Sequence, residues 1–436
     1  MISFENRPAQ YGKEERSGGP RWRLFVFLFI ASIIIIVLRR PDAILNPQFW
    51  AEDGKIFYAD AYHRGIIIPL LSPYGGYLDT FPRLVAAFSQ FFPLSWAPLL
   101  FNFPAIIIQA LPVALIMSSR FSSLISDWRV GIFLSFLYLN LPNSWEIHAN
   151  LTNAKVHLSL LAFIVLSAGP GSHPLWRIFD AGIVLISGLS GPFCIMLTPI
   201  AALFWFFRRD KWSFILLMLI GICALIQGAF LLMDHTRPQI PLGATPKLFL
   251  EILTGQVFWG ALAGQKGLQL IAQKGLPLIV HFATLYNLIV IVFGISELAA
   301  LINVMRKAPL ELRLFILYAL LIFCAALLSP LVNLTDPQWP LLLLPGVGGR
   351  YWFIPMLAFI SVLVWSLRRS SSRISKAFAA LAFAVMIIGI ILDWRHPAFK
   401  DFNFEEHAYR FESAPIGTQA TIPINPPGWS MTLFRH

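Results

Sequence analysis

The residues best suited to chemistry are two adjacent carboxylates, Glu52 and Asp53, in a polar stretch that directly follows an apolar segment. They lie between Trp50 and Phe57, and partial desolvation beside aromatic rings makes a carboxylate more basic. Either carboxylate could therefore act as a general base that deprotonates an acceptor hydroxyl. The alternative is that the pair only begins a helix over residues 55–64, because acidic side chains stabilise the start of a helix.

A second polar stretch, rich in amides and histidines, lies between two later apolar segments. Asn150, Asn153 and His157 are spaced by three and four residues, so they could share one face of a helix that is turned toward a cavity. Polar side chains at membrane depth usually face a functional interior, because their exposure to lipid is costly. Glu146 and His148 add groups that could bind a sugar. The alternative is an ordinary solvated loop with capping residues.

A phosphate leaving group would need fixed cations near the carboxylates, because it gains charge in the transition state. Arg350 is the first choice, since it follows glycines at the junction of a loop and an apolar segment. Arg83 and the Arg39-Arg40 pair are weaker candidates of the same kind. The alternative for Arg350 is an arginine whose charged head merely reaches the membrane interface.

The sequence predicts no metal site and no cofactor. His148, His157 and Glu146 lack a recognised ligand spacing, and no Asp-x-Asp motif surrounds Asp53. A divalent cation is possible but unsupported. The three cysteines lie inside apolar runs and form no Cys-x-x-Cys pair, so they predict neither a disulfide framework nor a zinc site.

The elements that must position these residues are those of a membrane protein. Of 436 residues, 57% are hydrophobic and 13% are charged, whereas about a quarter are charged in soluble domains. A membrane-spanning helix needs about 20 mostly apolar residues. Such runs predict an all-α, polytopic fold of about eleven transmembrane helices, and a helix over 83–92 either crosses or lies in the interface. The predicted spans are centred near residues 31, 107, 135, 162, 183, 200, 222, 288, 320, 359 and 384.

The net charge of +11 is carried by short basic clusters between apolar runs, which is typical of topology signals and not of a nucleic-acid-binding face. The clusters at 208–211, 306–307 and 368–376 predict the cytoplasmic side. Arg39-Arg40 would then lie outside, against the rule, so either this pair has a role of its own or the first span is inverted.

This topology places every long loop outside the cytoplasm, where no nucleotide is available. The chain contains neither a Walker loop nor a Gly-x-Gly-x-x-Gly motif that opens a helix after a strand. We predict a cytoplasmic tail (1–20), a membrane domain (21–393) with a catalytic loop (39–83) and outer loops (141–155, 233–276, 331–349), and an extracytoplasmic tail (394–436) that packs on the outer loops. Within 233–276, a helix over 248–262 could border a lipid entry path or simply cover span ends.

Three short motifs carry a resemblance: Phe49-Trp-Ala-Glu-Asp-Gly54, then Gly75-Gly-Tyr77 with Phe81-Pro-Arg83, and Gly349-Arg-Tyr-Trp-Phe-Ile-Pro355. Together with the span layout, they resemble the GT-C superfamily of membrane glycosyltransferases, within a poorly characterised bacterial branch. The resemblance implies a catalytic acid in the first outer loop, with Tyr77, Arg83, Arg350 and Tyr351 in substrate binding. Many relatives carry Asp-Glu or Asp alone, so either carboxylate could be the base, and we favour Asp53.

The resemblance further implies transfer of a sugar from a polyprenyl-phosphate-linked donor to a cell-envelope glycan or lipid, on the outer face of a bacterial plasma membrane. The donor, the acceptor and the bilayer are then the partners, and no nucleic acid is expected. The competing hypotheses are a transporter or flippase of lipid-linked saccharides, a membrane acyltransferase that uses His281, and a non-catalytic scaffold. Transporters tend to show internal repeats and charges at the midplane, and neither is visible in the sequence.

Overall fold

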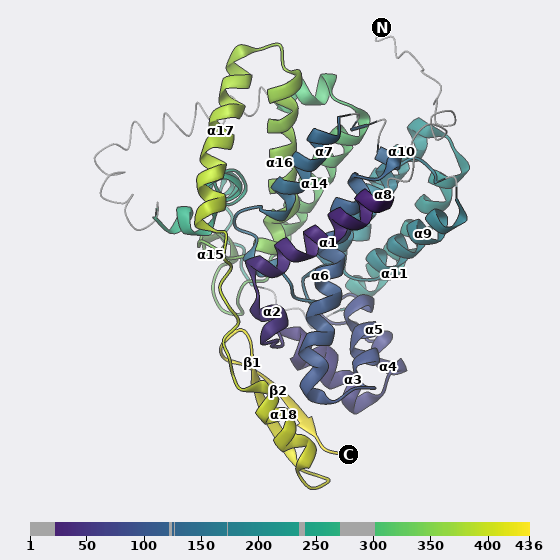
Figure 1. Cartoon of the computed structure of the whole chain (residues 1–436), viewed down its shortest axis with the longest axis vertical. Coiled ribbons are helices and arrows are strands. Elements are labelled where there is room, and N and C mark those ends of the chain that lie inside the picture. The colour runs from purple at the N-terminus through teal and green to yellow at the C-terminus, as the bar shows by residue number, and fades with distance from the viewer. Residues whose placement is uncertain (1–21, 122–123, 126, 172, 235–239, 271–300) are drawn as a thin grey trace.

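The computed structural model of the chain is mostly helical and describes residues 22–121, 124–125, 127–171, 173–234, 240–270 and 301–436 (Figure 1). Among these residues, five helices are long and apolar enough to cross a membrane. The predicted membrane class is confirmed at this level. The five are Leu94–Ile116, which joins η2 (Leu94–Trp96) to α6 (Ala97–Ile116), α11 (Lys211–Met233), α14 (Leu310–Leu328), α16 (Gly349–Arg369) and α17 (Arg373–Leu392).

Further helices lie before α11 in the chain. Every predicted span centre except the one near residue 288 falls within a described helix, whereas that one and His281 lie outside the described residues. The helices predicted at these centres are thus present. How many of them cross a membrane stays a prediction. The additional helices are α1 (Trp22–Arg39), α7 (Trp128–Leu139), α8 (Ala154–Ser167), α9 (Pro174–Gly188) and α10 (Phe193–Arg208).

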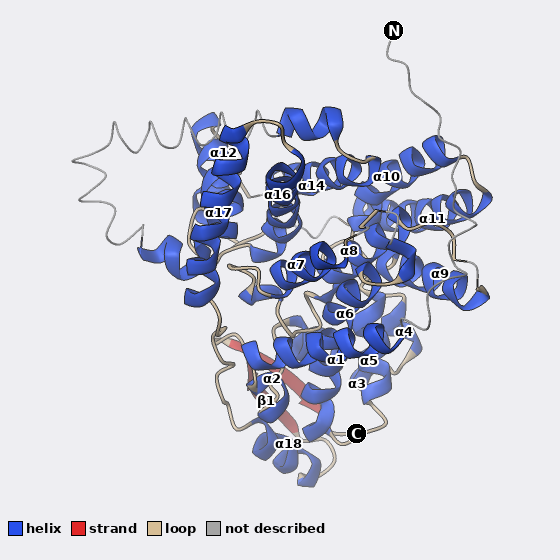
Figure 2. Cartoon of the chain, turned by 45° about the horizontal axis from the view of Figure 1, so that its top comes forward, coloured by secondary structure: helices blue, strands red, loops and turns tan. Residues whose placement is uncertain are grey.

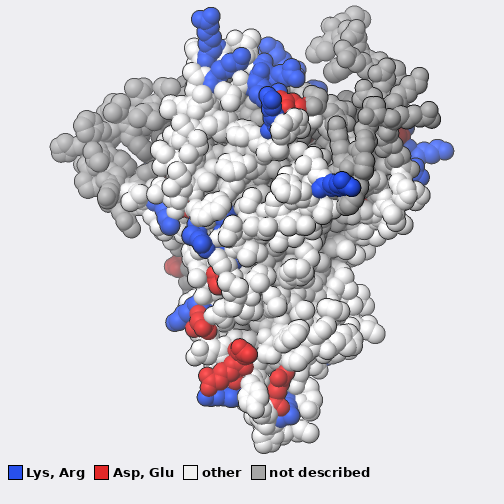
Figure 3. Space-filling view, in the orientation of Figure 1, with Lys and Arg blue, Asp and Glu red and all other residues white. Residues whose placement is uncertain are grey.

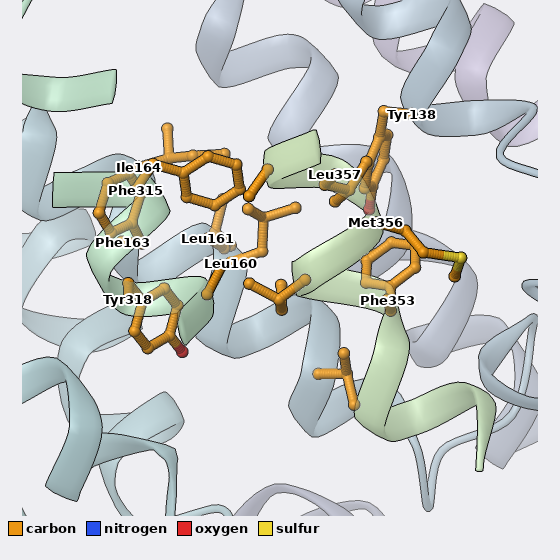
Figure 4. Packing of buried hydrophobic residues seen from close by; sticks show 14 of the residues in the cluster. Tyr138, Leu160, Leu161, Phe163, Ile164, Phe315, Tyr318, Phe353, Met356 and Leu357 are labelled. Atoms are coloured by element: carbon orange, nitrogen blue, oxygen red, sulfur yellow. The ribbon is translucent and has the colours of Figure 1, made fainter. Parts of the chain in front are cut away.

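Helix α8 lies at the centre of the bundle (Figure 2). All of its residues except Lys155 are buried, as expected for a helix that is apolar on every side. Figure 4 shows how Leu160, Leu161 and Phe163 pack toward α14 and α16. The ring of Phe163 stacks on Tyr318 at a centroid distance of 5.6 Å. This packing holds the first turn of α8, and therefore Lys155, in a fixed place.

Large apolar side chains are also exposed around the outside of the bundle, for example Leu225 at 76%, Leu232 at 83% and Ile391 at 69%. A soluble protein rarely exposes so much apolar surface, so this surface fits contact with lipid. In Figure 3, basic side chains gather over the end that carries the turn between α16 and α17, and most visible acidic side chains lie toward the opposite end. The charge distribution therefore distinguishes the two ends of the bundle.

The segment between α1 and α6 folds into several short helices. They are α2 (Asp42–Leu45), the π-helix η1 (Asp53–Tyr58), α3 (Ala59–Arg64), α4 (Ile67–Leu70) and α5 (Thr80–Ser89). The helices predicted over 55–64 and 83–92 are therefore found, the second beginning earlier. Single π-helical turns occur frequently at functional sites.

The other short elements lie between the long helices. They are η3 (Ser119–Phe121), η4 (Trp145–Ile147), α12 (Pro246–Ile252), the π-helix η5 (Leu253–Trp259) and α15 (Gln338–Leu342). The predicted helix over 248–262 is present as α12, η5 and the α-helical residues that follow η5. Its residues Gln256 and Val257 are buried and η5 contacts α16, so it packs into the bundle on one side.

The tail 394–436 contains α18 (Phe404–Ser413) and an antiparallel hairpin of β1 (Gln419–Ile424) and β2 (Trp429–Phe434), paired from Gln419 with Phe434 to Ile424 with Trp429. This hairpin departs from the all-α expectation. The tail packs on the segment that follows α1, as we expected. Phe404 and Phe49 meet edge to face, and the Asn425 backbone bonds to Phe49 and Ala51.

The buried pair Arg39-Arg40 ends α1 and binds backbone carbonyls of distant segments. Arg39 donates to the carbonyls of Leu139, at 2.6 Å, and Trp394, at 3.2 Å. Arg40 donates to the carbonyl of His148 at 2.7 Å. The pair thus has a structural role, which was one of the two explanations that the sequence left open; the side of the membrane on which it lies stays a prediction. It ties the loop 141–155 and the tail to α1.

Candidate functional site

Asp53 is completely buried, and its carboxylate binds the segment that leads into α8. Oδ1 accepts a hydrogen bond of 2.8 Å from the Thr152 hydroxyl, and Oδ2 accepts one of 3.2 Å from the Leu151 backbone N–H. Burial raises the pKa of Asp53 to about 8, and the charge of Glu52 adds to this shift despite the opposing hydrogen bonds. Asp53 therefore holds two loops together and is largely protonated at neutral pH.

Glu52 has a different environment, although it is the next residue. Its side chain is half-buried, and no hydrogen bond or ion pair of its carboxylate occurs within the described part of the chain. Its charge acts on Asp53, Tyr74 and Lys155, which places these groups nearby. Glu52 stands at the N-cap of η1 and Asp53 in its first turn, as the capping alternative expected, although the Glu52 side chain makes no capping hydrogen bond.

The backbone immediately before the pair is in a rare conformation. Ala51 has φ of 46°, in the left-handed region, although it has a side chain. Its N–H bonds to the Asn425 carbonyl at 2.5 Å, which helps to hold this conformation. Local strain of this kind persists where the surrounding structure enforces it, and it is concentrated at functional sites.

Lys155 forms a buried ion pair that the sequence analysis missed. Its Nζ lies 3.0 Å from Asp79 Oδ2 and donates to the Tyr77 hydroxyl at 3.3 Å. Burial raises the pKa of Asp79, while the Lys155 charge opposes that shift. Tyr77 was predicted as a binding residue, whereas Lys155 stands inside the polar 143–157 stretch and was passed over. Its position beside two asparagines and a histidine was the signal that could have identified it.

Arg350 and Glu146, predicted separately from the sequence, form an ion pair. Arg350 Nη1 contacts Glu146 Oε1, and the Arg350 backbone N–H donates to Glu146 Oε2 at 3.3 Å. Its Nη2 donates to the Tyr351 hydroxyl at 3.2 Å, and the guanidinium lies 4.6 Å from the Tyr351 ring centroid. Nη2 also donates to the Leu331 carbonyl at 2.9 Å, so both terminal nitrogens have partners within the protein, while the Arg350 side chain as a whole is 35% exposed.

These two groups of residues belong to one cluster. Trp50 and Trp145 meet edge to face at a centroid distance of 6.0 Å, which joins the Glu52 segment to the Glu146 segment. Tyr77 and Tyr351 are close enough to interact electrostatically. We call the part of the bundle that carries Glu52, Lys155 and Arg350 the site end. We expected both carboxylates in one outward-facing cavity within reach of Arg350; Asp53 is instead fully buried, and a cavity shared by Glu52 and Arg350 stays a prediction.

The predicted shared helical face of Asn150, Asn153 and His157 is wrong, because α8 begins only at Ala154. The Asn150 side chain donates to the Glu146 carbonyl at 2.7 Å, and the Asn153 side chain donates to the same oxygen at 3.0 Å. Both amides therefore stabilise their own loop. The loop is also almost fully buried, so the alternative of an ordinary solvated loop is wrong as well.

The histidines of the same stretch have structural partners on both ring nitrogens. His148 Nε2 lies 2.8 Å from the Ile36 carbonyl, and Nδ1 lies 3.0 Å from the Gln109 amide. His157 lies 3.0 Å from the Tyr138 hydroxyl and 3.2 Å from the Ile147 carbonyl. Burial, together with Arg39 and Arg40, holds the pKa of His148 well below its usual value. In this structure, neither ring has a free nitrogen for a substrate.

Arg83 is also occupied within the protein. It is 2% exposed, pairs with Asp60 at 3.0 Å and lies over the Phe57 ring at 5.4 Å. This arrangement fixes α5 against η1 and α3. Arg83 therefore helps to hold in place the helix that begins at Glu52.

The described residues contain no group of three or more histidine, cysteine or acidic side chains that could hold a metal ion. No protein-family model and no curated protein matches this chain. Fold and site together define a mostly helical protein with several helices able to cross a membrane, and with a polar, ion-paired cluster at one end.

Proposed function

We propose that the protein is a glycosyltransferase that moves a sugar from a polyprenyl-phosphate-linked donor to a cell-envelope glycan or lipid. The observation that carries the proposal is the Glu52 carboxylate, which is unpaired within the described structure, half-buried and close enough to Lys155 to interact with it electrostatically. A free carboxylate in such a place is suited to general-base catalysis. The resemblance of the Glu52 and Arg350 motifs to GT-C enzymes supports the same assignment.

The reaction would begin when Glu52 removes the proton from an acceptor hydroxyl. The resulting alkoxide attacks the anomeric carbon, a new glycosidic C–O bond forms, and the bond from that carbon to the phosphate oxygen breaks. The lipid phosphate leaves with the bonding electron pair. Its developing negative charge would be stabilised by Arg350, with Lys155 contributing from the first turn of α8.

Asp53, favoured from the sequence as the base, suits a positioning role better. Its pKa of about 8 leaves it mostly protonated at neutral pH, and both its oxygens are bound to Thr152 and Leu151. Glu52 is therefore our proposed base, and Asp53 fixes the loop that presents it. Tyr77, Tyr351 and Glu146 would help to hold the phosphate-binding cations in place.

A deletion strain complemented with Glu52→Gln tests this proposal, with membrane levels measured and envelope glycans read by mass spectrometry. We expect normal protein levels and loss of one defined sugar, because an amide cannot accept the proton. With purified protein, turnover should fall by about 10²- to 10⁴-fold. The matched control is Glu405→Gln, which removes an exposed carboxylate in the tail and should leave activity unchanged. Full activity of Glu52→Gln would favour the transporter or flippase alternative.

The proposed location is the bacterial plasma membrane, with the site end on the extracytoplasmic face. A single cysteine introduced as Arg209→Cys in a cysteine-free background should react with a membrane-impermeant maleimide only after the cells are opened. The basic residues that follow α10 predict this side. Labelling of intact cells at this position would invert the topology and place Glu52 in the cytoplasm.

A further inference from the structure

The site end contains buried polar atoms without a hydrogen-bond partner in the described structure. Both polar atoms of the Asn143 side chain are unpaired, although the residue is only 1% exposed. The indole Nε1 of Trp145 and the Oε1 of Gln256 are also buried and unpaired. Buried polar groups are normally satisfied, because an unmade hydrogen bond costs stability. Their concentration here needs an explanation.

All three residues meet the same glycine-rich segment, 342–349. Gln256 Nε2 donates to the Leu342 carbonyl at 2.8 Å, which leaves its Oε1 free. A Cβ atom at Gly346 would lie 3.1 Å from Trp145 Nε1, and one at Gly349 would lie 3.7 Å from the Asn143 carbonyl. No side chain at position 346 meets Trp145 Nε1, because a glycine stands there. The Asn143 side chain lies against Gly260 instead, where a Cβ atom would be 3.0 Å from its Nδ2.

The chemistry of the unpaired atoms indicates the kind of ligand. The Asn143 amide offers donors and an acceptor, the Trp145 indole N–H is a donor, and Gln256 Oε1 is an acceptor. Together these groups are uncharged and can both donate and accept hydrogen bonds. They lie beside the paired rings of Trp50 and Trp145. A polyhydroxylated sugar ring offers both donors and acceptors, together with an apolar face for an aromatic ring. An ion would instead be bound by Arg350, which follows the glycine segment directly.

We propose that Asn143, Trp145 and Gln256 form the subsite that receives the sugar ring of the lipid-linked donor. The donor phosphate would then lie toward Arg350, and the anomeric carbon between this subsite and Glu52. Trp145 is half-buried and the Arg350 side chain is 35% exposed, so the proposed subsite borders the surface at these two residues. This inference rests on the proposed function and assigns sugar recognition to residues other than Asn150, Asn153, His148 and His157.

Binding of short-chain polyprenyl phosphates to the full chain in nanodiscs tests the subsite. The probes carry glucose, mannose, galactose or arabinose, and the bare polyprenyl phosphate is the reference. Wild type should bind one glycosylated lipid more tightly than the bare lipid. Trp145→Phe and Asn143→Gly should each weaken binding of that lipid by roughly 5- to 20-fold, as expected for one lost hydrogen bond, and leave bare-lipid binding unchanged.

Thermal stability separates this role from a structural one. Trp145→Phe removes an N–H that has no partner and loses only ring packing, so its Tm without ligand should fall less than that of a variant that also loses a hydrogen bond. The matched control is Trp339→Phe, because the Trp339 indole donates to the Leu327 carbonyl at 2.9 Å. That variant should lower Tm and keep the preference for the glycosylated lipid.

Two results would overturn the subsite. One is a wild type with no preference among the five lipids. The other is full preference in both Trp145→Phe and Asn143→Gly, which would mean that ordered water alone satisfies these atoms. Either result leaves the transferase proposal open, because turnover by Glu52→Gln tests that separately.

Discussion

Lys155→Met is expected to lower the free energy of unfolding by about 3–5 kcal/mol, because it leaves a buried carboxylate without its partner. The Asp79 side chain is fully buried, and its oxygens lie 3.0 and 3.2 Å from Lys155 Nζ. Lys155 also bonds to the Tyr77 hydroxyl, so the loop before α5 would lose its contact with α8. Chemical unfolding in detergent, followed by tryptophan fluorescence, measures the change.

A second variant distinguishes this pair from an ordinary surface contact. Lys247 and Glu251 lie one helical turn apart, 3.8 Å from each other, with the lysine side chain 84% exposed. Lys247→Met should change stability by less than about 1 kcal/mol. The double variant Lys155→Met with Asp79→Leu should recover most of the loss, because an apolar pair avoids the unpaired charge. Equal losses in the two lysine variants would contradict the buried-pair argument.

Asp53→Asn is expected to change how stability depends on pH. The folded-state pKa of Asp53 is about 8, far above its usual value near 3.8, so between these values the folded protein keeps a proton that the unfolded chain has lost. The contribution of Asp53 to the free energy of unfolding is therefore most favourable at low pH. It falls by up to about 1.4 kcal/mol per pH unit as the pH rises through this window. Above pH 8 the slope should vanish.

Asparagine resembles the protonated acid and should remove this slope. Tm measured from pH 5 to 9 should fall more steeply for wild type than for Asp53→Asn, so the variant should be the more stable protein at pH 9. Glu405→Gln, in the exposed part of the tail, should follow wild type. Parallel curves for wild type and Asp53→Asn would show that Asp53 is ionised throughout in the folded state.

The sequence predicted the helices well, because apolar runs of membrane length leave little choice of secondary structure. It also selected both Glu146 and Arg350 as candidate site residues, but it did not predict that the two form an ion pair. The ranking of Glu52 and Asp53 could not be predicted. It depends on which carboxylate meets Leu151 and Thr152, and that contact spans almost a hundred residues.

Long-range partners explain the other differences. Asn150, Asn153, His148 and His157 have the composition of a binding site, yet they are used for packing. The partners of His148 come from α1 and α6, which local spacing cannot reveal. The hairpin in the tail was missed because both strands are short and partly exposed, and because β1 contains a proline, which weakens the strand signal.

The docking of the tail on the first loop affects how the protein must be made. Phe399 donates its backbone N–H to Asp42, 357 residues earlier in the chain, and Asn425 pairs with the segment just before Glu52. During synthesis, the segment with Glu52 is made long before its covering partner exists. Until then, Phe49 and Phe57 lack part of the apolar cover that buries them in the finished protein. Chains that stall late in translation would therefore expose this surface, where quality-control proteases and chaperones recognise incomplete folding.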